Sequence, residues 1–412
     1  MAFDRETKSL HTVLLLMCAS LAFAQPPQLT PLAADVLAHP QAVRGSDGAK
    51  HLVYEVRIAN LTDKRFSLKQ IEVLDERGAT LRQLNAQTIG TRLSLGGRRG
   101  SESNALEGYQ FGVLFIHVII PDRTPLPTSL RHVFAGYSER IGSDISMRVA
   151  ETRVDTAEPP VLAAPLQGAG YAAADGCCDT IRHVRALLTL DGRFCLAQRF
   201  AVDWEQVDDA GRIFTGDPKS VQSYRIYGQP VFAVADGEVV AARNDLEDQV
   251  PGALPKGLPL DQADGNFAII KLREGVYALY AHMRRDTVKV SAGARVHRGE
   301  QIGDVGNSGN TQAPHLHFQL MDRADALAAN GLPYVFASYR VTAVDQAGTE
   351  DFDRAELSGT PLTLTHSNPP IEEKQSLPLD LAIVTWENVK SPARATGART
   401  GKNSDSMDDG NS

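Results

Sequence analysis

Residues 265–282 read GNFAIIKLREGVYALYAH, two apolar runs separated by a short charged turn at 273–275. Short runs rich in β-branched and aromatic residues and bounded by glycine predict β-strands, and a turn of this length predicts a hairpin. Further glycine-punctuated runs of the same kind lie at 231–241, 290–305 and 314–320. Helical periodicity is scarce around them, so residues 168–345 are predicted to form an all-β domain.

Residues 26–160 carry a second set of strand patterns. Residues 51–59 and 66–74 alternate apolar and polar side chains and are separated by turn-forming residues. Short strands at this spacing predict an N-terminal β-sandwich of the immunoglobulin-like type. His117 and His132 stand alone in this region, and we expect them to be structural.

The segments outside these two regions differ from them in composition. Thr156–Gln167 is rich in proline and alanine and is predicted to be a linker. Residues 346–386 form a C-terminal extension, in which Leu377–Trp386 has the pattern of one further strand. Residues 387–412 contain almost nothing apolar and are predicted to be a disordered tail, because they bury too little surface to offset the entropy of ordering.

Residues 1–24 are predicted to be a signal peptide. A basic start at Arg5 precedes the apolar run from Thr12 to Ala24, which ends in small residues as a cleavage site requires. The run is shorter than the about 20 residues of a membrane-spanning helix, so we expect no transmembrane segment. The mature protein is expected to be periplasmic or secreted. Cys18 raises the alternative of a lipid anchor, which the bulky Met17 before it disfavours.

The overall composition limits the classes of function. The chain has 412 residues, of which 42 % are hydrophobic, and this suffices for two or three domains with buried cores. Its 42 basic and 50 acidic residues give a formal net charge of −8. Because phosphate contacts need a surplus of clustered Lys and Arg, we expect no nucleic-acid partner.

Three cysteines remain after removal of the signal peptide. In an oxidising compartment we predict one disulfide, from Cys195 to either Cys177 or Cys178, with one thiol left over. The adjacent pair has no second pair of CxxC type, so a structural bridge or buried free thiols are favoured over a zinc–thiolate site.

The sequence His315-Leu-His317 is the first candidate for chemistry. Side chains at i and i+2 of a strand project from the same face, so the two imidazoles lie side by side. Such a pair suits a metal site or a catalytic site. Two surface histidines on a strand are the simpler alternative.

The surroundings of this pair favour the functional interpretation. GDVGNSGNTQAPHLHF at 303–318, with Tyr280-Ala-His282 upstream, resembles the lysostaphin/LytM-type zinc metallopeptidases. These are secreted endopeptidases that cut peptides in peptidoglycan. The resemblance covers roughly residues 180–340 and implies a LytM-type antiparallel β-sheet peptidase domain. It also implies Zn²⁺ as the cofactor and a peptidoglycan peptide as the substrate.

Residue by residue, the resemblance implies that His317 is a zinc ligand. It places His315 and His282 beside the open metal position as catalytic residues. A catalytic zinc keeps three protein ligands and a water, and amide hydrolysis needs a base for that water and a donor for the oxyanion. We assign His315 as base and later proton donor and His282 to the oxyanion, and the two roles are exchangeable.

The remaining ligands depart from the family's first motif, HxxxD. Asp203 fits the aspartate, but Arg199 occupies the histidine's place and cannot ligate a cation. Either the zinc site is damaged or another histidine replaces the missing one. His183 is the candidate, in a hairpin that turns at Asp191-Gly192 and places it opposite Phe200.

Strict pairing in that hairpin would turn His183 and Asp203 to opposite faces, so a bulge or a longer turn is required. An ordinary surface histidine is the alternative. His183, Asp203 and His317 are therefore the expected metal ligands.

Two other function classes compete with an enzyme. A non-catalytic LytM-like domain that activates another cell-wall hydrolase would show a missing ligand such as the one at Arg199. A biotinyl- or lipoyl-type carrier is disfavoured, because no lysine occupies the hairpin tip in residues 288–306. The loop Asn244–Gly265 is expected to line or cover the cleft. The sandwich is expected to have a binding, spacing or autoinhibitory role.

Overall fold

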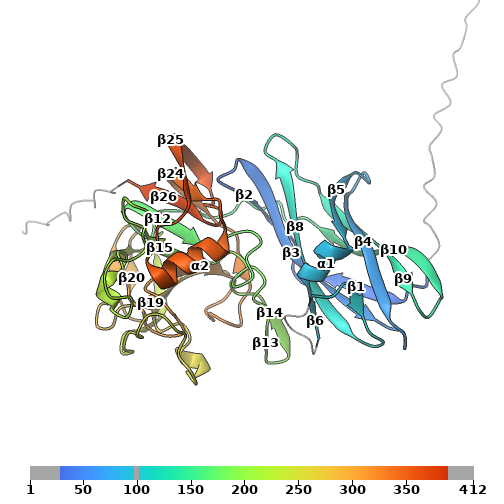
Figure 1. The fold of residues 1–412 in the computed structure, drawn as a ribbon, viewed down its shortest axis with the longest axis horizontal. Helices are drawn as coiled ribbons and strands as arrows, with labels where there is room; N and C mark the ends of the chain where they lie inside the picture. The colour runs from blue at the N-terminus through green and yellow to red at the C-terminus, as the bar shows by residue number, and fades with distance from the viewer. Residues whose placement is uncertain (1–27, 97–101, 388–412) are drawn as a thin grey trace, which may run out of the picture.

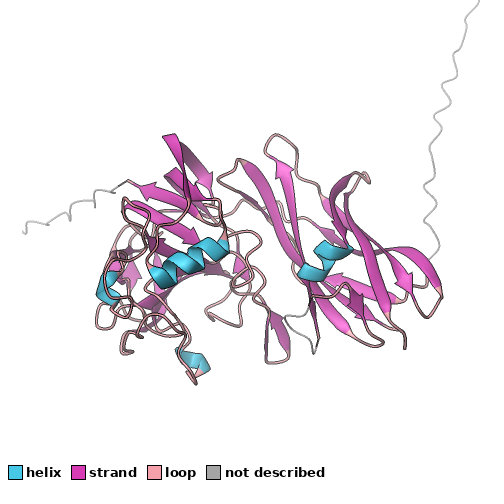
Figure 2. Cartoon of the chain, viewed as in Figure 1, coloured by secondary structure: helices cyan, strands magenta, loops and turns pink. Residues whose placement is uncertain are grey.

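The computed structural model describes residues 28–96 and 102–387 (Figure 1). The predicted signal peptide at 1–24 lies outside the described residues, as does the predicted tail from residue 388 onward. Figure 2 shows a chain built mainly of strands, and this confirms the all-β prediction. Within the described residues no helix has the length and apolar character needed to cross a membrane.

The N-terminal half contains two sheets. The strands of residues 28–96 and 102–155 form two five-stranded sheets. The first has the order β1-β3-β8-β6, with β2 paired to β3. The second has the order β10-β9-β4-β5, with β7 paired to β4. The first sheet contains β1 (Leu32–Val36), β2 (Ala42–Arg44), β3 (Ala49–Asn60), β6 (Leu93–Leu95) and β8 (Phe111–Pro121). The second contains β4 (Phe66–Asp75), β5 (Thr80–Asn85), β7 (Ala105–Leu106), β9 (Ser129–Ser138) and β10 (Ser143–Arg153). The short helix α1 (Ala86–Arg92) connects β5 to β6.

The two sheets share one apolar core. Leu52 of β3 and Leu114 of β8 pack in the same buried cluster as Phe66 of β4 and Phe134 of β9. The alternating pattern of residues 66–74 explains this, because every second side chain points between the sheets. The predicted β-sandwich is therefore present.

The second half is built on one large sheet. Residues 161–386 form a twelve-stranded sheet ordered β11-β24-β26-β12-β15-β22-β19-β18-β17-β20, with β23 on β22 and β25 on β24. Its central strands are β12 (Gly168–Ala174), β15 (Val202–Gln206), β22 (Leu316–Met321), β19 (Val276–Met283), β18 (Asn266–Arg273) and β17 (Gly237–Arg243). The outer strands are β11 (Val161–Leu162), β20 (Arg295–Val296), β23 (Gly331–Leu332), β24 (Val335–Asp345), β25 (Leu364–Ser376) and β26 (Ala382–Trp386).

Two short two-stranded sheets accompany the large one. They pair β13 (Leu188–Leu190) with β14 (Arg193–Cys195), and β16 (Pro230–Phe232) with β21 (Gln301–Asp304). The hairpin predicted at 265–282 is formed by β18 and β19, which pair antiparallel.

Segments expected to lie outside the domains belong to this sheet. Strand β11 falls in the predicted linker and pairs parallel with β24, while Leu162 and Leu166 are buried in the core. The linker prediction is wrong here because these apolar side chains outweigh the neighbouring prolines. The C-terminal extension contributes β25 and β26, and β26 lies between β24 and β12. It also contributes the helix α2 (Thr349–Ser358).

The predicted disulfide is wrong. Cys177 and Cys178 are bonded to each other, and Cys195 is a buried free thiol among the described residues. The adjacent pair follows β12 in the large sheet, whereas Cys195 ends the separate β13–β14 hairpin, where its Sγ contacts the carbonyl of Arg193.

A buried ion pair joins the two halves. The guanidinium of Arg199 donates two hydrogen bonds of 2.8 Å to the carboxylate of Glu55 on β3, and a third to the carbonyl of Gly331. Both charged side chains are buried, with exposed fractions of 5 % and 0 %. Val43 and Val53 of the sandwich also belong to the apolar core of the second half.

Removing one partner of this pair should be costly. We expect Glu55→Gln to lower the free energy of unfolding by about 3–5 kcal/mol, because it leaves the Arg199 charge buried and uncompensated. Denaturant unfolding of the full chain measures this. The matched control is Asp35→Asn, which breaks the exposed pair with Arg57 on the same sheet and should cost less than about 1 kcal/mol. Equal losses in the two variants would contradict the prediction.

His132 should make the sandwich sensitive to acid. The buried ring donates from Nδ1 to the carbonyl of Ala150 and accepts at Nε2 from the hydroxyl of Tyr54. Burial lowers the pKa of His132 to about 4, whereas the unfolded chain titrates near 6.5. The unfolded state therefore binds more protons between these values, and about 3 kcal/mol of stability present above pH 6.5 is lost as pH falls to 4. Unfolding of His132→Gln should depend less steeply on pH over that window than unfolding of the wild type.

Candidate metal centre

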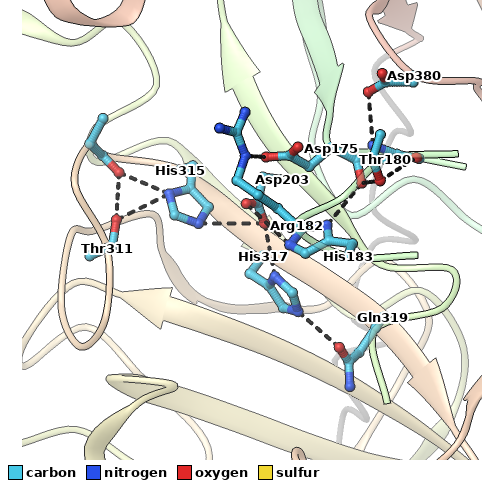
Figure 3. A network of polar contacts seen from close by, with 12 residues as sticks. Asp175, Thr180, Arg182, His183, Asp203, Thr311, His315, His317, Gln319 and Asp380 are labelled. Atoms are coloured by element: carbon cyan, nitrogen blue, oxygen red, sulfur yellow. Dashed lines mark hydrogen bonds and ion pairs between the residues drawn. The ribbon is translucent and has the colours of Figure 1, made fainter. Parts of the chain in front are cut away.

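Strand pairing places Asp203 directly opposite His317. Strand β15 lies between β12 and β22, and the register of β15 with β22 pairs these two residues. Opposed residues on neighbouring strands share a face of the sheet, so their side chains meet. Nδ1 of His317 lies 2.8 Å from Oδ1 of Asp203 (Figure 3).

His183 reaches the same point from a turn. The prediction that it lies on a hairpin strand opposite Phe200 is wrong, because the hairpin is shorter: β13 and β14 pair only from Leu188↔Cys195 to Leu190↔Arg193. His183 precedes this hairpin in a turn, and its Nδ1–H donates to the carbonyl of Asp175. Its Nε2 lies 3.4 Å from Oδ2 of Asp203.

These three side chains form a set with metal-ligand chemistry. His183, Asp203 and His317 each offer one ligand atom, and these atoms all lie within 4.8 Å of one another. The Nε2–H of His317 donates to Oε1 of Gln319, as Nδ1–H of His183 donates to a carbonyl, so the other nitrogen of each ring faces the carboxylate. Outer hydrogen bonds of this kind orient metal-binding histidines. Two imidazole nitrogens and one carboxylate oxygen fit a zinc ion that keeps an open position.

The charges around Asp203 are consistent with a cation site. Burial alone would raise the pKa of this carboxyl, but His183, His315 and His317 together hold the pKa well below its usual range. Burial lowers the pKa of His183, whereas at His317 the contact with Asp203 outweighs burial and raises the pKa. A carboxylate that is largely removed from water needs a positive partner, and this cluster supplies it.

His282 and His315 line the same cavity. Nδ1–H of His282 donates to the carbonyl of Ser308 and Nδ1–H of His315 to that of Ala313, both at 2.8 Å, which leaves Nε2 of each ring available. Their ring centroids are 4.7 Å apart, and Nε2 of His315 lies 3.5 Å from Asp203. Burial and the two neighbouring imidazoles hold the pKa of His282 well below its usual value. The structure thus brings all five predicted site residues together.

The cavity has a volume of about 410 Å³ and contains groups that the sequence analysis missed. Glu205 lies two residues after Asp203 on β15, a spacing that predicts the same face. Glu356 comes from α2, and no local signal places it there. Burial and their proximity raise the pKa of Glu205 well above its usual value, and burial raises that of Glu356. Leu254 of the expected cleft loop also lines the cavity.

Comparison with known proteins identifies the second half. A sequence profile of Peptidase family M23 matches residues 220–329. The lipoprotein NlpD of Yersinia enterocolitica is 32 % identical over 108 residues, which is 26 % of this chain and 91 % of NlpD. The chain belongs to peptidase family M23. The M23 match includes His282, His315 and His317, whereas Asp203 and His183 lie upstream of it.

Two further M23-type relatives are much longer than the matched region. The cell division protein DipM of Caulobacter vibrioides is 36 % identical over 93 residues, 23 % of this chain and 12 % of DipM. The peptidoglycan DD-endopeptidase ShyA of Vibrio cholerae is 34 % identical over 106 residues, 25 % of this chain and 20 % of ShyA. The chain therefore matches only a fifth or less of either protein.

Solved M23 structures show weaker similarity. The catalytic domain of lysostaphin from Staphylococcus simulans is 22 % identical, with 39 % of this chain and 86 % of that chain covered and a TM-score of 0.22. A zinc-containing peptidase from Vibrio cholerae is 14 % identical, with coverage of 68 % and 79 % and a TM-score of 0.23.

Gln319 is expected to affect the zinc affinity of the centre without being a ligand. We expect Gln319→Leu to weaken zinc binding about 10–100-fold, because His317 loses the acceptor that fixes its ring. Competition with a chromogenic chelator measures the affinity. Gln301→Leu is the control, since Gln301 on β21 does not line the cavity. Unchanged affinity in Gln319→Leu would show that His317 is oriented by other contacts.

Proposed function

We propose that this protein is a zinc-dependent metalloendopeptidase that hydrolyses peptide bonds in peptidoglycan cross-links and acts in the periplasm or outside the cell. The observation that carries the proposal is the convergence of His183, Asp203 and His317 in one cavity with His282 and His315. Membership of family M23 and similarity to a relative named peptidoglycan DD-endopeptidase support the reaction and the substrate.

In this proposal His183, Asp203 and His317 hold the zinc ion. The chemistry supplied by zinc in such a site is a water of lowered pKa and a Lewis acid for the scissile carbonyl. The aspartate provides the negative charge, and the outer hydrogen bonds of the two histidines keep their free nitrogens turned inward.

His315 and His282 carry the proton transfers. Each ring gives its Nδ1–H to a carbonyl, so a neutral ring presents the Nε2 lone pair and can accept a proton from water. A ring that carries the extra proton donates from Nε2 to the oxyanion or to the leaving amine. We assign His315 as the base and His282 as the oxyanion partner. Because both rings have the same hydrogen-bond arrangement, the two roles are exchangeable.

A second candidate is a non-catalytic domain that binds and activates another cell-wall hydrolase. The observation that favours it is Arg199, which occupies the motif position of a zinc-ligating histidine and contacts Glu55 instead. The two candidates differ in metal content, since the activator needs no zinc.

Metal analysis of purified protein, with digestion of cell-wall sacculi as the activity assay, tests the proposal. We expect about one zinc per chain in the wild type, and loss of both zinc and activity in Asp203→Ala, His317→Ala and His183→Ala. His297→Ala is the matched control, because His297 is exposed and lies outside the cavity. Full zinc and activity in His183→Ala would remove His183 from the site. Zinc-free, inactive wild-type protein would favour the activator.

The two catalytic histidines should separate metal binding from turnover. His315→Ala and His282→Ala are expected to keep zinc and to lose about 10²–10⁴-fold in kcat, because each removes a proton-transfer group but no ligand. Steady-state rates on a soluble cross-linked peptide measure this. Loss of zinc in either variant would make that histidine a ligand.

A further inference from the structure

A second group of metal-binding side chains lies where the two halves meet. His51 is on β3, His117 is on β8, and Cys178 follows β12 of the large sheet. Each offers one ligand atom, and these atoms all lie within 4.8 Å of one another. His51 and Cys178 are buried, with exposed fractions of 2 % and 6 %, and none of the three lines the cavity of the candidate metal centre. His117, expected to stand alone, therefore has a partner.

The hydrogen bonds of the two rings require a cation between them. The outer nitrogens, Nε2 of His51 and Nδ1 of His117, contact the carboxylates of Asp47 at 3.0 Å and Asp179 at 3.2 Å. A carboxylate only accepts, so each outer nitrogen carries the N–H. The inner nitrogens, Nδ1 of His51 and Nε2 of His117, then face each other at 2.9 Å. Each of these three contacts needs one N–H group, but two neutral imidazoles have only two. A third proton or another cation is therefore needed between the inner nitrogens.

A metal ion is a second way to supply the positive charge that this arrangement needs. Metal-binding histidines commonly give their outer N–H to a carboxylate, as both rings do here. Two imidazoles and a thiolate are ligands that zinc prefers. Asp179 also accepts from Arg92 at 2.6 Å, so the outer contact of His117 is held in place from the sandwich side.

We propose that His51, His117 and Cys178 form a second zinc site, available when the Cys177–Cys178 disulfide is reduced. An external dithiol supplies two electrons and two protons, so the disulfide becomes two thiols and the dithiol becomes a disulfide. Metal binding then releases the thiol proton of Cys178 to solvent, and Cys177 remains a thiol. The disulfide and the metal are thus alternative states of one site, and the metal state links the sandwich to the M23 half.

Cobalt substitution of the full chain tests the site. Thiolate ligation gives Co²⁺ a charge-transfer absorption in the near ultraviolet, and none of the described residues lining the candidate metal centre is a cysteine. We expect protein reduced with dithiothreitol, then freed of it without air, to bind one more equivalent of Co²⁺ than oxidised protein and to show this band. Equal binding without a band in either state would overturn the proposal.

Variants assign the ligands. Cys178→Ser should lose the band, whereas Cys195→Ser, which removes the buried thiol of the β13–β14 hairpin, should keep it. Asp47→Asn should weaken Co²⁺ binding at this site about 10–100-fold, and its side chain is 42 % exposed, so the fold should tolerate the change. Full affinity in both Asp47→Asn and His117→Gln would exclude the histidines as ligands. His317→Ala should lose the other equivalent and retain the band, which separates this test from that of the proposed function.

Discussion

The partly buried carboxylate of Asp203 is the group on which the candidate metal centre depends. It lies on β15, whose register with β22 sets it against His317, while His183 approaches it from a turn and His315 from the position just before β22. A lone buried carboxylate is costly, and imidazoles crowded together without a negative charge are costly too. The carboxylate and the imidazoles therefore stabilise each other, and a bound cation interacts favourably with the carboxylate and with the imidazole lone pairs.

Arg199 lies where the family resemblance leads us to expect a zinc-ligating histidine. Four residues before Asp203, its guanidinium is directed to Glu55 in the sandwich rather than to the centre. A buried guanidinium needs a carboxylate partner, and here another part of the chain provides it. The same short segment thus anchors the sandwich through Arg199 and presents a candidate ligand through Asp203. The sandwich is therefore in direct contact with the segment that carries Asp203.

Patterns within short stretches of sequence predicted individual strands and neighbouring site residues. They did not predict which segments distant in the sequence contact each other. Alternation and glycine punctuation predicted β18 and β19, and the i, i+2 rule predicted that His315 and His317 share a site. The position of His183 depended on the length of a hairpin, which its Asp-Gly turn does not specify. The contact of His51 with His117 comes from pairing of β3 with β8, and a histidine considered alone carries no signal of it.

The parts of the chain outside the M23 match at 220–329 explain how the centre is completed. Arg182, next to His183 in the turn, is paired with Asp175 and with Asp353 of α2, as Figure 3 shows for the first of these contacts. Arg182 is half exposed, so these pairs contribute little to the stability of the fold. The C-terminal extension therefore contacts the turn that carries His183, as the sandwich contacts the segment that carries Asp203. Asp203 is thus set against His317 by a strand inside the match, while the residues next to both upstream candidate ligands also contact regions that the M23 profile does not contain.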